Sequence, residues 1–333
     1  MLDVGRRETL LNQIASVGAS NFEAVALDVF RFQAKHNLLY ADYLALLGIQ
    51  PDLIQSILEI PFLPIQFFKN YEIKTGNWQE ALVFSSSGTT GTQTSRHYLR
   101  DTDWYRQNAR LAFQQFYGNI TEYCVLALLP AYLERSGSSL VFMADDFIEQ
   151  SRYPQSGFFL YNTDALLKII EECQKKAVPC LLIGVSFALL DLAEQQQPDL
   201  SGVIVMETGG MKGRRKELTR AELHDILTTA FKVENIHSEY GMTELLSQAY
   251  SKGQGLFHAP NTMKVMTREI TDPLQVQQRG KTGAINIIDL ANLDTISFIA
   301  TDDLGKVYPD GTFEILGRMD NSDMRGCNLL IAI

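Results

Sequence analysis

Several features of other protein classes are missing from this chain of 333 residues. No window approaches roughly eighteen uninterrupted apolar residues, so no membrane-spanning helix is expected. The first residues, MLDVGRRETLLNQIASVG, contain neither a long apolar core nor a small-residue cleavage site. They predict an amphipathic helix and not a signal peptide. The 29 basic residues, against 39 acidic ones, form no basic stripe, which argues against a nucleic-acid partner.

Cysteine is scarce and has no metal-binding spacing. The four cysteines are Cys124, Cys173, Cys180 and Cys327, and no two of them form a CxxC pair. This usage is typical of reduced thiols in a cytoplasmic protein. The sequence therefore predicts a cytoplasmic location and no cysteine metal site.

The arrangement of apolar residues predicts an α/β protein. The length suits one large α/β domain or two subdomains. Residues 1–60 follow a helical pattern, and residues 60–70, with two prolines, favour an extended segment. Beyond them, strand-like runs (81–84, 122–130, 179–186, 202–210 and 233–241) alternate with helix-like runs (164–177, 217–231 and TELLSQAY, 243–250). This order predicts a largely parallel sheet covered by helices, followed by shorter strands at 283–290, 296–305 and 311–318.

A loop rich in hydroxyls stands out at FSSSGTTGTQTSRH, residues 84–97. Gly88 and Gly91 allow backbone amides to turn toward an anion, and the serine and threonine hydroxyls add neutral donors. The stretch is not a P-loop, because no lysine follows the second glycine. A polyphosphate-binding loop and a plain polar turn between two strands both fit these residues.

Three motifs in order resemble the adenylate-forming superfamily of acyl-CoA synthetases, aryl-CoA ligases and luciferase-like enzymes. They are SSGTTG (86–91), EYGMTE (239–244) and ATDDLG (300–305) with GRMDNSDMRG (317–326). The helical start, ETGGMKGRRKELTR (207–220) and the MRGCNLLI ending are most similar to one branch. That branch is the acyl-protein synthetases, the long-chain-fatty-acid–protein ligases of bacterial luminescence fatty-acid reductase complexes.

The resemblance implies a fold and an organisation. The fold would be the large domain of these enzymes, with layered, mainly parallel sheets and helices and a small β-rich subdomain. A helical segment (1–80) would pack on an α/β core (81–254), followed by the β-rich subdomain (255–326) and a short tail (327–333). The usual C-terminal lid domain, which carries a catalytic lysine and builds the CoA tunnel, would be absent.

The resemblance also assigns the ATP-binding residues. The β- and γ-phosphates would be bound by Ser86, Ser87, Gly88, Thr89, Thr90 and Gly91. Most relatives carry a lysine where this chain has Thr94, so Arg96 or His97 is a candidate substitute. Tyr240 would stack on adenine, which Gly209 and Gly210 would let the backbone approach. For these two glycines, a turn that ends a strand is the alternative.

Four further residues would surround the reacting groups. Thr243 and Arg318 would contact the α-phosphate, and Asp303 would accept the ribose hydroxyls. Glu244 would hold Mg²⁺, or it would merely complement the dipole at the start of a helix. Asp303 follows Asp302, and two adjacent aspartates in a turn are often only solvated.

Five other polar residues each allow two interpretations. His237 and His258 would line the acyl pocket or serve as structural histidines. Lys212, Arg214 and Arg215 would steer ATP or form the solvated start of a helix. Residues 127–147 would form a wall of the acyl pocket.

Cys327 decides the expected subclass. A thiol just past the hinge motif could attack an acyl-adenylate and hold the acid as a thioester, or pack as a small apolar side chain. The resemblance favours ATP- and Mg²⁺-dependent activation of a fatty acid, with transfer through Cys327 to a partner protein or reductase. A CoA ligase without its lid and a non-catalytic nucleotide-binding subunit are the alternatives.

Overall fold

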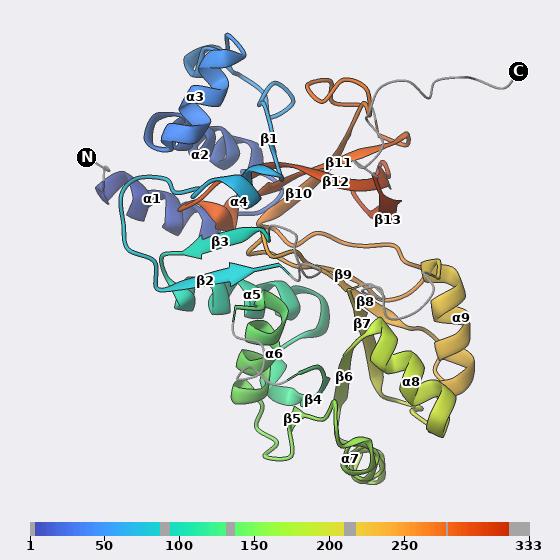
Figure 1. Ribbon diagram of the computed structural model, residues 1–333. Coiled ribbons are helices and arrows are strands. Elements are labelled where there is room, and N and C mark those ends of the chain that lie inside the picture. The colour runs from blue at the N-terminus through green and yellow to red at the C-terminus, as the bar shows by residue number, and fades with distance from the viewer. Residues whose placement is uncertain (1–3, 87–93, 131–136, 210–217, 278, 320–333) are drawn as a thin grey trace, which may run out of the picture.

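A computed structural model describes residues 4–86, 94–130, 137–209, 218–277 and 279–319. Two sheets, each with its own helices, form the two halves of the molecule (Figure 1). Among the helices of these ranges, none combines the length and the apolar character needed to cross a bilayer.

The first half contains a six-stranded sheet in the order β5-β4-β6-β7-β8-β9. Its strands are β4 (Cys124–Leu128), β5 (Gly157–Phe158), β6 (Cys180–Val185), β7 (Ile204–Thr208), β8 (His237–Tyr240) and β9 (Ala249–Ser251). Neighbours from β5 to β8 are parallel, and β9 runs antiparallel to β8. Every residue of β4 and β6 is buried, as expected for strands with helices on both faces. The predicted parallel sheet is confirmed.

Five helices cover this sheet. They are α5 (Thr102–Tyr117), α6 (Ser139–Gln150), α7 (Thr163–Lys175), α8 (Ser186–Gln196) and α9 (Arg220–Phe231). Figure 1 shows α5 and α6 on one face and α8 and α9 on the other, with α7 at the lower end. Side-chain caps fix several starts: Asp101 accepts two amides at α5, and Thr219 and Glu222 form a capping box at α9.

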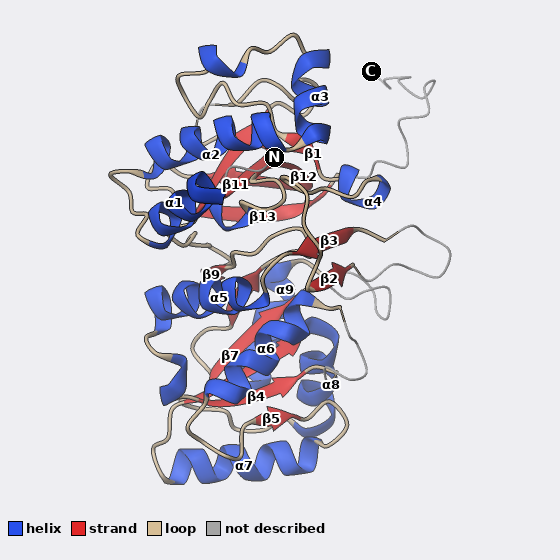
Figure 2. Cartoon of the chain, turned by 90° about the vertical axis from the view of Figure 1, so that its left-hand side faces the viewer, coloured by secondary structure: helices blue, strands red, loops and turns tan. Residues whose placement is uncertain are grey.

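The second half is built on a five-stranded sheet. Strand order is β1-β12-β11-β10, and β13 pairs with β12. The strands are β1 (Leu63–Pro64), β10 (Met263–Arg268), β11 (Thr282–Asp289), β12 (Phe298–Val307) and β13 (Phe313–Arg318). The helices α1 (Val4–Ala15), α2 (Phe22–His36) and α3 (Leu38–Leu46) lie over it (Figure 2). Phe30 of α2 meets Phe298 of β12 edge-on at 5.8 Å, so the N-terminal helices share a core with the late strands.

The remaining elements are short, and one of them, a hairpin, lies between the halves (Figure 1). The hairpin of β2 (Leu82–Ser85) and β3 (Arg96–Leu99) carries the hydroxyl loop. The 3-10 turns are η1 (Pro51–Leu53), η2 (Ile120–Glu122) and η3 (Leu290–Asn292). Residues 60–70 contain β1 and also the short helix α4 (Phe67–Asn70), so the expected extended segment is only partly extended.

One predicted element is wrong. The stretch TELLSQAY (243–250) forms no helix: a turn at Thr243 and Glu244 leads through irregular backbone into β9. Tertiary bonds explain the difference, because the buried Asp289 carboxylate accepts the backbone amides of Leu246 and Ser247. These bonds satisfy the amides without a helical ladder.

Candidate active site

The site lies where the carboxyl ends of the parallel strands face the second sheet. β7 ends at Thr208 and β8 at Tyr240, and both strands point toward β12 and β13 (Figure 1). Ligands of open α/β sheets bind at this edge, because the loops that leave the strands converge there. The motif residues that the structure describes gather around the end of β8.

Tyr240, Asp303 and Arg318 form a hydrogen-bonded group. The Tyr240 hydroxyl donates to Asp303 Oδ2 at 2.7 Å, and Arg318 Nε donates to Asp303 Oδ1 at 3.1 Å. Asp303 and Arg318 are register partners on β12 and β13, which places their side chains on one face of the sheet. A tertiary hydrogen bond thus joins Tyr240 to Asp303, which lies 63 positions away. Strand pairing brings Asp303 next to Arg318, which lies 15 positions away.

The three groups differ in exposure. The Asp303 residue is 5 % exposed, so the reading of Asp303 as a solvated turn residue is wrong. The Arg318 side chain is 71 % exposed, and its guanidinium can therefore reach a ligand while it is anchored to Asp303. Partial burial is the largest single effect and lowers the pKa of Arg318. The charge of Asp303, its hydrogen bond and the charge of Glu244 together outweigh burial, so the net pKa lies above the ordinary value. The Arg318 guanidinium therefore places a permanent positive charge at this edge of the sheet.

Tyr240 is packed as well as bonded. Its ring lies 5.8 Å from Phe257 and 5.8 Å from Phe313, and 8 % of the residue is exposed. Burial and then the neighbouring Asp303 charge raise the pKa of its hydroxyl well above the ordinary value, so the proton stays on the oxygen. Gly241 follows, and a side chain there would collide with the Glu239 carboxylate. Adenine stacking by Tyr240 stays a prediction.

Glu244 presents a buried carboxylate beside this group. Burial raises its pKa, and a hydrogen bond from the Ser95 side chain counteracts part of the rise. The charges of Arg318 and Asp303 act on it in opposite directions. Because Glu244 starts no helix, its reading as a helix-dipole partner is wrong.

The carboxylate of Glu244 fits a divalent cation. Mg²⁺ prefers hard anionic oxygen ligands, and a carboxylate removed from water gains most from a nearby cation. Asn292 Nδ2 donates to the Glu244 carbonyl at 2.8 Å and holds the backbone of the turn in place.

His97 supports the same turn from β3. Its Nδ1 lies 2.8 Å from the Thr243 carbonyl, and its Nε2 lies 3.0 Å from Thr295 Oγ1. A carbonyl only accepts, so Nδ1 carries the proton. Burial lowers the pKa of His97 to about 4, and the ring is neutral at pH 7. His97 therefore does not substitute for the missing lysine, whereas Arg96 lies on the surface of the same strand.

The base of the hydroxyl loop is closed by paired serines. The Ser95 amide donates to Ser86 Oγ at 2.9 Å, and the Ser86 amide donates to the Ser95 carbonyl at 3.1 Å. Gly209 follows β7 with φ of 69°, a left-handed conformation that favours glycine, and its carbonyl accepts from Ser186. Several predicted residues lie outside the described ranges: Ser87, Gly88, Thr89, Thr90, Gly91, Gly210, Lys212, Arg214, Arg215 and Cys327.

The histidines His237 and His258, for which the sequence allows two roles, lie apart from the group formed by Tyr240, Asp303 and Arg318. His237 begins β8, is half-buried, and its Nδ1 lies 3.1 Å from the Tyr117 hydroxyl. Burial, with a smaller effect of the Lys252 charge, lowers its pKa to about 4. His258 is exposed, and its backbone pairs with Tyr250.

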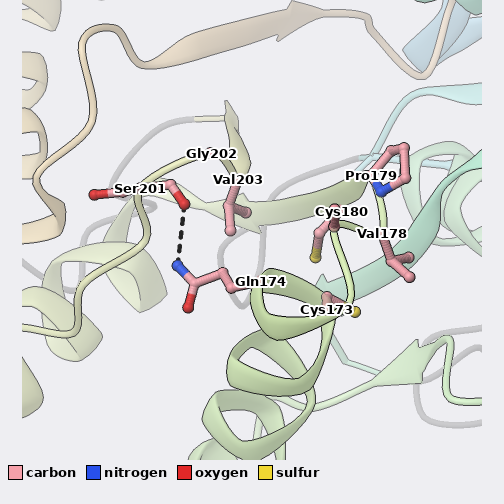
Figure 3. A pocket seen from close by; sticks show the side chains of 9 residues that line it. Cys173, Gln174, Val178, Pro179, Cys180, Ser201, Gly202 and Val203 are labelled. Atoms are coloured by element: carbon pink, nitrogen blue, oxygen red, sulfur yellow. Dashed lines mark hydrogen bonds between the residues drawn. The ribbon is translucent and has the colours of Figure 1, made fainter.

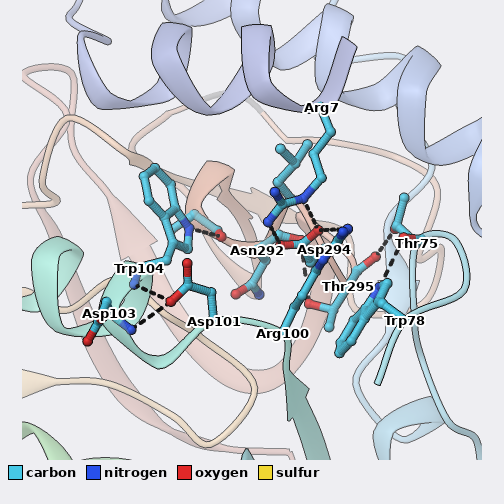
Figure 4. A network of polar contacts seen from close by, with 12 residues as sticks. Arg7, Thr75, Trp78, Arg100, Asp101, Asp103, Trp104, Asn292, Asp294 and Thr295 are labelled. Atoms are coloured by element: carbon cyan, nitrogen blue, oxygen red, sulfur yellow. Dashed lines mark hydrogen bonds and ion pairs between the residues drawn. The ribbon is translucent and has the colours of Figure 1, made fainter. Parts of the chain in front are cut away.

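A support network was not visible in the sequence. Figure 4 shows Arg7 of α1 and Arg100 beside Asp294, with Trp104 and Trp78 nearby. Arg7 donates to both Asp294 oxygens at 2.6 and 2.5 Å, and the Thr75 hydroxyl donates to the Thr295 carbonyl at 2.5 Å. The network positions the turn at residues 292–295. Thr295 of this turn contacts His97, and Asn292 contacts the Glu244 carbonyl. No motif indicated it, because its members come from four distant segments.

Comparison with known proteins identifies the fold. No protein-family profile matches the chain, and no curated protein matches it in sequence. ATP-bound MatB from Rhodopseudomonas palustris matches with a TM-score of 0.54 at 18 % identity, over 71 % of this chain and 47 % of that one. A 2-hydroxyisobutyryl-CoA ligase in a postadenylation complex gives 0.63 at 13 % identity, over 93 % and 70 %. The same ligase in an open form with 2-HIB-AMP and CoA gives 0.62 at 13 % identity, over 93 % and 78 %.

These matches show that the chain shares its α/β fold with MatB and with the 2-hydroxyisobutyryl-CoA ligase. The chain spans about half the length of MatB. At such low identities the similarity extends to the fold alone.

Proposed function

We propose that the chain activates a carboxylic acid with ATP as an acyl-adenylate and passes the acyl group through Cys327 to a partner. One observation carries the first half of the proposal. Tyr240 and Glu244 come from one motif of the adenylate-forming pattern and Asp303 and Arg318 from another, and all four meet at the carboxyl edge of the sheet. Convergence of this kind is expected of a site and not of four unrelated structural residues.

The residues have distinct tasks in this reaction. Asp303 would accept the ribose hydroxyls, and its contacts with Tyr240 and Arg318 keep its carboxylate in one orientation. Arg318, exposed and always charged, would stabilise the negative charge that shifts on the α-phosphate during attack by the acid. Thr243 would donate to the same phosphate, from a turn whose carbonyl is held by His97.

Bound Mg²⁺ would neutralise the triphosphate and the departing pyrophosphate. Glu244 would hold it, because its carboxylate is buried and a cation offsets the cost of that burial. The hydroxyl loop that starts at Ser86 would contribute neutral donors to the β- and γ-phosphates. Neutral donors bind pyrophosphate less tightly than fixed cations do, which favours release of the product.

The second half of the proposal concerns Cys327. The thiolate would attack the acyl carbonyl, the bond to AMP would break, and AMP would leave with the bonding electron pair. The thiol proton would go to solvent. The resulting thioester keeps the carbonyl electrophilic, which suits delivery to a reductase or another acceptor protein.

The proposal is tested with ATP, Mg²⁺ and a panel of fatty, aryl and short hydroxy acids. The measurements are pyrophosphate release and the intact mass of the protein. We expect pyrophosphate release and one added acyl group that hydroxylamine removes. In Cys327→Ser, pyrophosphate release should persist and the hydroxylamine-sensitive mass should be lost. No release with any acid would overturn the adenylation proposal, and equal labelling of the two proteins would overturn the role of Cys327.

Product release that depends on CoA would instead support a CoA ligase, the activity for which the matched 2-hydroxyisobutyryl-CoA ligase is named. Tight ATP binding without pyrophosphate release would support a non-catalytic nucleotide-binding subunit.

A further inference from the structure

Three cysteines that are far apart in the sequence meet in the interior. Cys124 opens β4 and Cys180 opens β6, and the two are direct partners in the parallel ladder. Cys173 lies in α7, shortly before its end at Lys175. The three sulfur atoms all lie within 4.8 Å of one another, and the three residues are 0, 1 and 2 % exposed. The spacing of the cysteines in the sequence, from which no metal site was expected, gave no sign of this cluster.

The cluster lies at the opposite end of the sheet from the candidate active site. β4 and β6 begin at the cysteines, whereas the Tyr240 group stands where the parallel strands end. The further inference therefore does not depend on the proposed adenylation.

A surface pocket reaches the cluster. It has a volume of about 380 Å³, and Cys173, Cys180, Pro179 and Val203 are among its lining residues (Figure 3). Gln174 forms part of its wall and donates to the Ser201 carbonyl at 3.0 Å. Two of the three cysteines line this pocket, so the pocket adjoins the cluster.

We propose that Cys124, Cys173 and Cys180 form a site for one soft metal ion, with Cu(I) as the best-matched ion. Thiolate sulfur selects soft ions, and within the described residues the cluster contains neither histidine nor carboxylate. With metal–sulfur bonds of about 2.3 Å, three sulfurs around one ion lie roughly 3.8–4.0 Å apart. Sulfur separations of at most 4.8 Å reach that range by small side-chain rotations.

Ligand number favours Cu(I) over Zn²⁺. Structural zinc sites are almost always closed by four protein ligands, and this cluster offers three. Cu(I) accepts three thiolates in a plane. On binding, three S–H bonds break, three Cu–S bonds form, and three protons pass to solvent. Ser156 Oγ lies 4.0 Å from Cys124 Sγ and is placed to donate a weak hydrogen bond to the bound thiolate.

The rival to a metal site is a disulfide between the ladder partners Cys124 and Cys180. That bond would remove two hydrogen atoms from the thiols and would need an oxidant. A disulfide that persists under reducing conditions would contradict the metal proposal, because it would leave a single thiol at the site.

The test uses the full chain with Cys327→Ala, so that only the three clustered cysteines remain. The reduced protein is titrated anaerobically with Cu(I) against a coloured Cu(I) chelator. X-ray absorption of the loaded protein then counts the ligands. We expect one Cu(I) per chain with three sulfur ligands at about 2.3 Å. No competition with the chelator, or fewer than three sulfur ligands, would overturn the proposal.

Cys173→Ser on the same background supplies the variant test. It should bind Cu(I) at least about 100-fold more weakly, because loss of one of three direct ligands should cost no less than loss of an outer-shell partner. Unchanged affinity would contradict the assignment. If the variant does not fold, the ligand count on the parent protein still decides the question. A parallel titration with Zn²⁺ that proves tighter than Cu(I) would overturn the choice of ion.

Discussion

Among single residues, Glu244 combines deep burial with a charge that has to be compensated. We expect Glu244→Gln to lower pyrophosphate release by roughly 10²-fold or more, the usual scale for loss of a main electrostatic group. The amide keeps the shape of the side chain but is a poorer Mg²⁺ ligand. The measurement is initial rate against Mg²⁺ concentration, with circular dichroism to verify folding.

Glu314→Gln is the matched control for this substitution. Glu314 lies on β13 near Arg318, but its carboxylate accepts from the hydroxyl of the half-buried Tyr308 at 2.8 Å. The control should keep the parent rate. Near-normal turnover of Glu244→Gln would remove Glu244 from the metal-binding role.

Arg318 offers a second residue-level test. Arg318→Ala should lower kcat for adenylation much more than it raises the KM for ATP, because the guanidinium gains most as charge shifts on the α-phosphate. Arg318→Lys should recover only part of the rate, since an ammonium group cannot keep the Nε bond to Asp303 and also reach a ligand in the same geometry. A change confined to KM would make Arg318 a binding residue only.

At the scale of elements, β3 supports the Thr243–Glu244 turn through a histidine that is neutral in the folded state. The pKa of His97 falls from 6.5 to about 4 on burial. Between these values the unfolded chain binds a proton that the folded chain does not, so stability rises with pH. The contribution is full above the unfolded pKa and is lost as pH falls toward about 4. At pH 5 the loss amounts to roughly 2 kcal/mol.

This effect is measured by urea unfolding of the parent and of His97→Gln at pH 7 and pH 5. On acidification from pH 7 to pH 5, we expect the free energy of unfolding to fall by roughly 2 kcal/mol more in the parent than in the variant. His237 shifts in the same direction, and Glu239, whose pKa burial raises to about 7, shifts in the opposite one. Both groups are present in the two proteins, so they cancel in the difference. Parallel pH profiles would show that His97 is not the titrating group.

At the scale of the whole molecule, the N-terminal helices are tied to the late strands by a polar contact as well as by the shared apolar core. Arg7 binds both oxygens of Asp294, and the two side chains are each 13 % exposed. Arg7→Met should lower the free energy of unfolding by about 1–3 kcal/mol, the range for hydrogen bonds between charged groups. The measurement is the urea midpoint at unchanged slope.

Arg6→Met is the neighbouring control. Arg6 pairs with Asp28 within α1 and α2, where the side chains are 40 and 34 % exposed, so its loss should cost about 1 kcal/mol or less. Equal effects of the two substitutions would show that the Arg7–Asp294 contact does not tie the N-terminal helices to the late strands.

Motifs and periodicity predicted most of the strands and helices around the site. The runs at 122–130, 179–186 and 202–210 formed β4, β6 and β7, because continuous apolar strands of that length suit a sheet covered on both faces. The helix predicted for residues 243–250 does not form, because the Asp289 carboxylate, more than 40 positions away, accepts the amides of Leu246 and Ser247. These tertiary bonds outweigh the local helix preference.

Local pattern alone determined the α/β class, the parallel order of the sheet, and the motif positions of Tyr240, Glu244, Asp303 and Arg318, since each depends on residue types at short spacing. Only the tertiary structure decided that His97 is a neutral support for the Thr243 turn and that Asp294 binds Arg7. It also brought together Cys124, Cys173 and Cys180. These outcomes depend on burial and on contacts between distant segments. Spacing along the chain carries no information about either, because packing sets both.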